Sequence, residues 1–365
     1  MKKTLIALAA VAATGAAFAQ SSVTIYGRMD VGMNQQKTTL KQAGATAFYK
    51  GNNIVNEDGL STGLLGFKGT EDLGGGLTAN FVHEMDLDMD VGALGVGTGR
   101  DSTLGLSGGF GELRLGRSYT PLFSTIGASD VFGTTGAGTV NTFGLANTAV
   151  RASNAVFYTS PSFSGVTVKA FVQQNNAQDS TSVGNAGKTS ANGFSIAYAN
   201  GPLMLAAATG TEKGTSFNRM GALTATTALA AAAIAPVAAA NAKYTASAVT
   251  GTYDLGVAKI FAGFVTAKDD DNTTVVGGER TSKETNVGVA VPMGAVTLMA
   301  GFGNNKTSAA GDAQAAKGND YAVGATYSLS KRTTAYFKTG TYNKYSVNAD
   351  SVKTDRTSIG LRHTF

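Results

Sequence analysis

Alternation between apolar and polar side chains constrains this chain more than any other feature. In the first such segment, Val23, Ile25 and Met29 alternate with the polar Thr24 and Arg28. A repeat of two residues indicates a β-strand with one apolar and one polar face. The pattern predicts sixteen strands, an even number as closed outer-membrane barrels have, over residues 23–31, 64–70, 77–82, 101–107, 112–119, 151–158, 166–173, 193–200, 203–211, 244–254, 258–268, 281–291, 296–303, 321–329, 333–345 and 356–365.

The connections between these segments alternate in length. Short turns are expected at residues 71–76, 108–111, 160–165, 200–202, 254–256, 292–294 and 330–332. Long polar loops are expected at residues 34–59, 88–99, 118–150, 174–192, 212–243, 269–280, 304–319 and 346–355. Short turns at one rim and long loops at the other are typical of transmembrane β-barrels. The fold class we expect is therefore all-β, an antiparallel transmembrane barrel with short periplasmic turns and long extracellular loops.

Residues 1–19 have the pattern of a cleaved secretory signal peptide. Lys2 and Lys3 precede an apolar stretch at residues 5–11, and Ala17 and Ala19 form a small-x-small cleavage site. The apolar stretch is too short to be a membrane anchor. We therefore expect residues 20–365 to form a single barrel domain in the cell outer membrane. The chain has no cysteine, so the stability of the exported protein does not come from disulfides.

The loop at residues 118–150 is unusual because it is long and nearly uncharged. Between Tyr119 and Arg151, Asp130 is the only charged side chain, whereas Phe123, Phe132 and Phe143 are aromatic. Disordered loops are normally rich in charge and poor in aromatic residues. We therefore expect this loop to fold inside the barrel and to narrow it.

Seven motifs of the chain, in this order, resemble those of the trimeric general porins of Gram-negative outer membranes, of the beta-proteobacterial type. They are residues 21–27 (SSVTIYG), 66–74 (GFKGTEDLG), 106–111 (LSGGFG), 115–117 (LGR), 157–161 (FYTSP), 327–333 (YSLSKRT) and 360–365 (GLRHTF). The resemblance implies a 16-stranded barrel, a homotrimer, and a third extracellular loop, residues 118–150, that folds into the lumen. It also implies that the terminal aromatic residue, Phe365, is a signal read by the outer-membrane assembly machinery.

Charges on the inner wall decide which ions a channel prefers. The alternation places Arg28, Lys68, Arg114, Arg151 and Lys169 on the lumen side, together with Asp30, Glu84, Asp86, Asp101 and Glu112. Arg114 and Arg151 should lie near the narrowest point, because their strands lead into and out of the inward loop. The predicted constriction residues are Arg28, Lys68, Asp101, Arg114, Asp130, Arg151 and Lys169.

The resemblance also indicates how selective the channel is. Anion-preferring relatives have arginine at the position of Leu64, and some also at the position of Asp101, whereas Arg151 is retained here. The series of basic residues is thus thinner in this chain. We expect passive diffusion of small hydrophilic solutes and ions through a water-filled channel, with weak selectivity that slightly favours anions.

Other functions have weaker signals. His83 and His363 are the only histidines and suggest no Ser-His-Asp arrangement, so we expect no enzyme activity and no cofactor. The acidic residues at 86–90 resemble the start of a calcium loop but lack the closing glutamate. A substrate-specific channel, and a surface barrel that acts as an adhesin or structural protein, remain as alternatives.

The expected partners are a homotrimer, outer-membrane lipid and lipopolysaccharide, the assembly machinery and small solutes. Without Lys2 and Lys3, the 29 Lys and Arg become 27 against 24 Asp and Glu, too small an excess to indicate nucleic acid as a partner.

Overall fold

The computed structural model describes residues 22–42, 45–57, 59–89, 92–94, 99–133, 150–174, 188–214, 242–270, 280–309, 316–347 and 350–365. The signal peptide expected at residues 1–19, and residues 134–149 of the predicted inward loop, lie outside these ranges.

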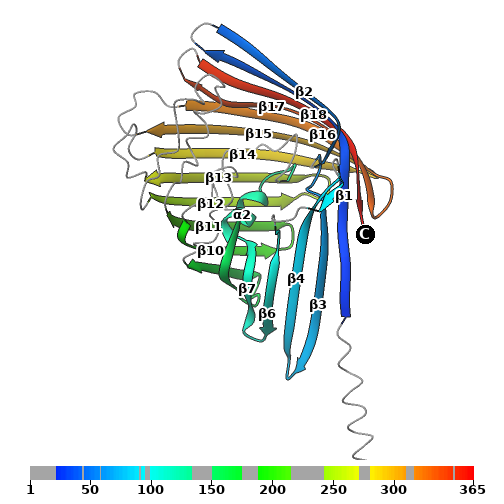
Figure 1. The fold of residues 1–365 in the computed structure, drawn as a ribbon, viewed down its shortest axis with the longest axis vertical. Helices are drawn as coiled ribbons and strands as arrows, with labels where there is room; N and C mark the ends of the chain where they lie inside the picture. The colour runs from blue at the N-terminus through cyan, green and yellow to red at the C-terminus, as the bar shows by residue number, and fades with distance from the viewer. Residues whose placement is uncertain are drawn as a thin grey trace, which may run out of the picture.

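Within the described ranges, sixteen antiparallel strands form a closed ring, as the alternation predicts. Figure 1 shows the strands from β10 to β15 side by side in chain order. Each strand pairs with the next one along the ring, and the last strand pairs with the first. The ring consists of β1 (Ser22–Gln42), β3 (Leu64–Gly74), β4 (Leu77–Asp88), β6 (Ser102–Gly108), β7 (Gly111–Tyr119), β8 (Arg151–Thr159), β9 (Val166–Gln174), β10 (Lys188–Asn200), β11 (Leu203–Gly214), β12 (Ala242–Asp254), β13 (Lys259–Asp270), β14 (Arg280–Met293), β15 (Val296–Ala309), β16 (Ala316–Ser328), β17 (Thr333–Val347) and β18 (Asp350–Thr364).

The ring closes where the end of the chain meets β1. The amide of Phe365 donates to the carbonyl of Gly27 at 3.0 Å, and the amide of Gly27 donates back to Phe365 at 3.0 Å. A Cβ atom on Gly27 would lie 2.6 Å from Cζ of Phe365. The missing side chain at Gly27 therefore makes room for the terminal aromatic ring.

The two faces of the wall differ as the alternation predicts. On the outside of β1, Val23 and Ile25 are each 62% exposed, whereas Asp30 on the inside is fully buried. Closure of the sheet lets every strand find a neighbour on both sides, the condition for spanning lipid.

The seven short turns lie where they were expected, at one rim of the barrel. Gly201, Gly256 and Gly294 occupy these turns with φ values of 56°, 79° and 63°. A side chain in this left-handed region would be strained, so glycine is the residue that allows such tight reversals.

Two of the expected long loops are partly strand. Residues 34–59 were predicted as a loop, but β1 continues to Gln42 and β2 (Ala45–Glu57) returns along it. Residues 346–355 are likewise mostly the hairpin of β17 and β18. A two-residue strand, β5 (Ala93–Leu94), pairs with β4 inside the loop expected at residues 88–99. Polar residues follow one another at consecutive positions here, as at Gln35, Gln36 and Lys37, so the sequence lacks the alternation that predicts the other strands.

One helix, α2 (Pro121–Gly127), lies against the inner face of the wall between β9 and β12 (Figure 1). In the described ranges, no helix combines the length and apolar character needed to cross a membrane.

Candidate functional site

The chain turns from the wall into the lumen at the end of β7. Thr120 caps α2, with its Oγ1 accepting a hydrogen bond from the amide of Phe123 at 3.2 Å. Pro121 follows at the first helical position, where a missing N–H costs nothing and the fixed φ favours a helix. We refer to residues 120–133 as the crossing segment.

The helix of the crossing segment packs on alanines of the inner wall. Leu122 and Ile126 are 5% and 0% exposed. They form an apolar cluster with residues of β11, β12 and β13, namely Ala208, Tyr244, Ala246, Ala248, Val265 and Ala267. Because most of these wall residues are alanine, the helix can approach the sheet closely.

The crossing segment continues around the wall to β16. The Nδ2 atom of Asn286 on β14 donates to the carbonyl of Ser129 at 2.7 Å. Val131 and Phe132 then form a second apolar cluster with Ala322 of β16. Residues more than 150 positions apart in the sequence are thus joined inside the barrel.

Glycines on the wall make these contacts possible. A Cβ atom on Gly288 would lie 2.8 Å from the side chain of Val131, and one on Gly324 would lie 3.0 Å from Phe132. A Cβ atom on Gly263 would overlap Ser129. Three strands, β13, β14 and β16, therefore have glycine where the crossing segment touches them.

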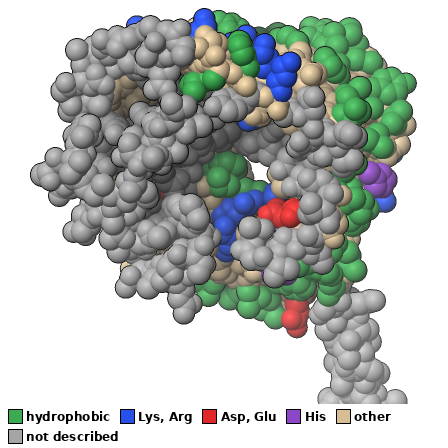
Figure 2. Space-filling view, turned by 45° about the horizontal axis from the view of Figure 1, so that its top comes forward, with side chains coloured by type: hydrophobic (Ala, Val, Ile, Leu, Met, Phe, Trp, Pro, Cys, Tyr) green, Lys and Arg blue, Asp and Glu red, His purple; other side chains and the backbone are tan. Residues whose placement is uncertain are grey.

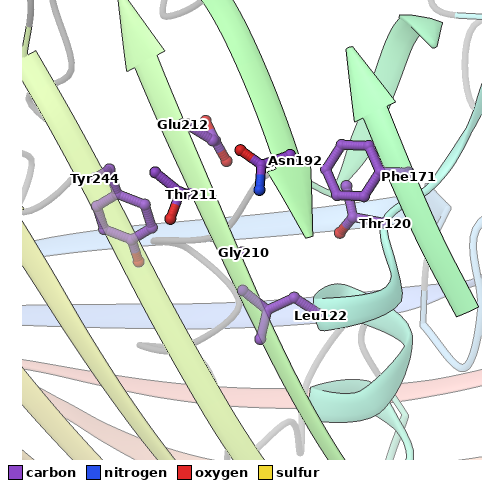
Figure 3. A pocket seen from close by; sticks show the side chains of 8 residues that line it. All are labelled: Thr120, Leu122, Phe171, Asn192, Gly210, Thr211, Glu212 and Tyr244. Carbon is purple, nitrogen blue, oxygen red and sulfur yellow. The ribbon is translucent and has the colours of Figure 1, made fainter. Parts of the chain in front are cut away.

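Little space is left between α2 and the wall behind it. The cavity there has a volume of about 10 Å³, which is no more than one water needs (Figure 3). Its lining comes from the start of the crossing segment and from β9 to β12, namely Thr120, Leu122, Phe171, Asn192, Gly210, Thr211, Glu212 and Tyr244. Solutes therefore cannot pass between α2 and the wall behind it, and the charged side chains described below lie elsewhere on the ring, on the wall from β1 to β9.

Tyr119 joins the crossing segment to two arginines of that wall. Its ring stacks on Phe123 of α2 at a centroid distance of 5.3 Å and an angle of 7°. Its hydroxyl accepts hydrogen bonds from Nη2 of Arg151 at 2.6 Å and from Nη2 of Arg100 at 2.8 Å. The guanidinium of Arg151 also lies over the ring, with Cζ 4.2 Å from the centroid.

Carboxylates of β4 neutralise Arg100. Its Nη1 lies 2.7 Å from Oδ1 of Asp86, and its Nε lies 3.7 Å from Oε2 of Glu84. Tyr26 of β1 donates to the other oxygen of Glu84 at 2.8 Å. Asp86, which begins the calcium-like stretch, is thus an ion-pair partner of an arginine.

Arg28 and Arg151 differ from Arg100, because neither has an ion pair with a carboxylate in the part of the chain that the structure describes. Arg28 donates from Nε to the carbonyl of Thr62 at 2.6 Å. The Nε atom of Arg151 is buried without a hydrogen-bond partner there. Lys68 lies over the ring of Tyr26, with Nζ 4.9 Å from the centroid. In the described ranges, no carboxylate forms an ion pair with Arg28, Lys68 or Arg151, so the positive charges of these three side chains act on the lumen.

Arg114, Asp101 and Lys169 line a separate cavity of about 160 Å³ beside the start of α2. Arg114 lies 3.7 Å from Oδ2 of Asp101 and 3.4 Å from Oε2 of Glu112. Ser118 also donates to Asp101 at 2.9 Å. Arg114 was expected to act at the narrowest point, but nearby carboxylates balance its charge.

Asp130 lies apart from the other predicted constriction residues. It is 5% exposed, and its Oδ1 accepts a hydrogen bond from the amide of Phe132 at 2.9 Å. It therefore shapes the far end of the crossing segment. Asp30, predicted to face the lumen as a wall charge, is fully buried and accepts hydrogen bonds from Tyr336 and from the amides of Leu60 and Ser61.

Sequence reasoning missed Arg100. The alternation placed Asp101 inside and therefore Arg100 outside, yet both side chains reach the inner wall. The backbone is irregular at this point, because both residues bond to Glu84 before β6 begins at Ser102. The inward acids Glu84 and Asp86 were the available signal that a cation should lie between them.

Figure 2 shows an opening through the molecule, with basic and acidic side chains side by side on its wall. The wall residues described above comprise six cations and five carboxylates, which leaves one positive charge in excess. Such a wall can attract small ions and orient polar solutes. The six cations are Arg28, Lys68, Arg100, Arg114, Arg151 and Lys169, and the five acids are Asp30, Glu84, Asp86, Asp101 and Glu112.

A family model described as "Gram-negative porin" matches residues 4–348. The chain is 31% identical to an outer membrane porin protein of Bordetella pertussis (strain Tohama I), over 100% of both chains. It is also 40% identical to "Outer membrane porin protein 32" of Delftia acidovorans over 214 residues, which span 56% of this chain and 58% of that relative.

Solved structures share the fold. The "Anion-selective porin from Comamonas acidovorans" matches with a TM-score of 0.71 and 25% identity, covering 95% of this chain and 100% of that one. A trimer form of OmpT, an outer membrane protein of Vibrio cholerae, matches with a TM-score of 0.67 and 17% identity, covering 94% and 99%.

Proposed function

The chain belongs to the family of Gram-negative porins, and we propose that its channel passes small hydrophilic solutes and ions by passive diffusion, with a slight preference for anions. Porins of this family are channels of the outer membrane, and this chain is not an enzyme. We further propose that residues 1–19 are removed during export.

The observation that carries the preference for anions is the unequal pairing of the wall charges. Arg100 and Arg114 have carboxylates within 4 Å, whereas Arg28 and Arg151 have none in the described ranges. Paired charges largely cancel beyond their immediate surroundings. The field in the lumen therefore comes mainly from the cations without carboxylate partners.

The preference should be weak for two reasons. The excess of cations over carboxylates on the wall is small, and mobile ions screen a wall charge over about 8–10 Å at physiological salt. Position 64, where anion-preferring relatives have arginine, is leucine, and Leu64 is buried. The similar fold of the anion-selective porin from Comamonas acidovorans supports the sign of the preference.

We also propose that the protein assembles as a homotrimer. The family resemblance favours this, and OmpT of Vibrio cholerae has a trimer form with the same fold. Each barrel would then conduct through its own lumen, and three conductance steps of equal size would accompany each insertion.

The test is single-channel recording of the purified protein in a planar bilayer, with reversal potential measured in a salt gradient. The proposal expects openings in groups of three and a reversal potential slightly on the anion side. Strong cation preference would overturn the proposed selectivity. Current that saturates with one added solute would instead indicate a substrate-specific channel, and a folded protein without conductance would indicate an adhesin or structural barrel.

A further inference from the structure

Three lysines form a row across neighbouring strands at the rim of the long loops. Lys283 of β14 pairs directly with Lys306 of β15, and Lys306 pairs directly with Lys317 of β16. All three side chains are exposed. We call Lys283, Lys306 and Lys317 the outer lysine row.

The row lies on the outside of the barrel. The inner face of β14 is marked by Asn286, which bonds to the crossing segment, so Lys283 at the opposite parity points outward. On β15 and β16, Met299 and Ala322 pack against Val131 and Phe132 in the lumen. The same parity argument places Lys306 and Lys317 outside.

Three like charges in such a row repel one another. Side chains directly opposite each other on paired strands have Cβ atoms about 4.5–5.5 Å apart, and like charges there are destabilising. No ion pair joins these lysines to a carboxylate in the ranges that the structure describes. An anion bound between the three ammonium groups would be attracted to each of them and would offset their mutual repulsion.

Along these three strands, the outward residues change from apolar and aromatic to uncharged polar and then to lysine, which is the order expected where a barrel leaves the hydrocarbon region of a membrane. Exposed Val287, Phe302 and Tyr321 lie in one cross-strand line, and the rings of Phe302 and Tyr321 are 5.3 Å apart. Next come Asn304 and Asn319, joined by a side-chain hydrogen bond of 2.6 Å. The lysine row follows, and Lys306 lies four residues, or about 13 Å along the strand, beyond Phe302.

Aromatic residues in this position mark the boundary of the hydrocarbon region. A row of ammonium groups a few residues further out lies at the depth of the lipid headgroups. Other outward lysines occur at the corresponding ends of neighbouring strands, where Lys213 of β11 pairs with Lys243 of β12 and Lys268 is exposed on β13.

We propose that the outer lysine row binds the phosphate groups of an anionic lipid headgroup in the outer leaflet. This inference rests on the proposed function, a channel of the outer membrane whose long loops are expected to lie outside the cell. Lysine suits the role because its ammonium is a compact point charge with three donors, a common phosphate ligand. The headgroup would bridge the three strands and remove the repulsion between their lysines.

The test is a binding titration of the folded protein in an uncharged detergent with purified, fluorescently labelled lipopolysaccharide, in phosphorylated and dephosphorylated forms. The variant Lys283→Gln/Lys306→Gln/Lys317→Gln should bind the phosphorylated form roughly a hundredfold more weakly, since each lysine near a membrane surface contributes about fivefold. The corresponding variant with three arginines should bind like the wild type. The wild type and both variants should bind the dephosphorylated form with similar affinity.

A matched control removes three cations from the opposite rim, as Lys259→Gln/Lys331→Gln/Arg332→Gln. This control should bind lipopolysaccharide like the wild type. Equal binding by the row variant and the wild type, or equal losses in the row variant and the control, would overturn the proposal. Single-channel conductance of the row variant should match the wild type, and a wild type that binds lipid but does not conduct would count against the proposed function alone.

Discussion

The guanidinium of Arg151 lies over the ring of Tyr119 and also donates a hydrogen bond of 2.6 Å to its hydroxyl. Tyr119 is the last residue of β7 and stacks on Phe123 of α2. The arginine is therefore held at the entry of the crossing segment by a neutral partner. A carboxylate in the place of Tyr119 would hold Arg151 equally well but would cancel its charge.

Arg151→Gln should shift the selectivity of the channel toward cations. A unit charge about 8 Å from a passing ion in water changes its energy by about 0.5 kcal/mol, and screening reduces this effect, so the anion-to-cation permeability ratio should fall about twofold. The measurement is the reversal potential in a salt gradient, at low ionic strength where screening is weakest.

The double variant Arg114→Gln/Asp101→Asn is the matched control for Arg151, because it removes a cation together with a carboxylate 3.7 Å away. Its reversal potential should stay close to that of the wild type. If both variants shift the reversal potential equally, the ion pairing of the wall charges does not decide which of them set the selectivity.

Gly288→Ala should push the crossing segment away from the wall. The added Cβ would lie 2.8 Å from the side chain of Val131, so one of the two must move, and the wall strand is held by hydrogen bonds on both sides. Movement of Val131 into the lumen should lower single-channel conductance. Gly109→Ala, in a turn with no atom within 4 Å of its new Cβ, serves as the control and should conduct normally. An unchanged conductance in Gly288→Ala would show that this part of the crossing segment does not border the ion path.

The sequence predicts the sixteen strands of the ring and their short turns because alternation is a local signal. Its aromatic residues and its lack of charge also predict that the inward loop packs against the barrel, and the described part of that loop, residues 120–133, does contact the inner wall. The sequence does not predict which wall strands that segment contacts, because Ser129 and Asn286 are far apart in the sequence and only the closed ring brings them together.

The site was predictable in part for the same reason. Arg28, Lys68 and Arg151 lie on the inner wall as their parity indicates. Arg100 was missed because parity fails where the backbone is irregular, and the balance between Arg114 and Asp101 depends on side-chain geometry that no local pattern records.

Asp30→Ala should destabilise the barrel without changing its selectivity. Asp30 is fully buried and accepts hydrogen bonds from the amides of Leu60 and Ser61, at 2.9 and 2.6 Å, and from Tyr336 at 2.7 Å. Removing a buried hydrogen-bond acceptor costs about 1–3 kcal/mol for each donor that it served, so the loss should total several kcal/mol. The temperature at which the folded form disappears in a heat-modifiability gel should drop clearly. Glu71→Ala, an exposed carboxylate beside a short turn, should leave that temperature unchanged, and an equal drop would refute the anchoring role of Asp30.

Phe365→Ala separates a role in assembly from a role in packing. The ring of Phe365 is 39% exposed, and the two hydrogen bonds with Gly27 come from the main chain, which alanine retains. Protein refolded in detergent should therefore lose little stability and conduct normally. If the terminal ring is read by the assembly machinery, the same variant expressed in cells should reach the outer membrane several-fold more slowly, and Phe365→Tyr should restore the rate. A loss of stability in the refolded variant that matches the loss of assembly would instead show that the ring acts by filling the space above Gly27.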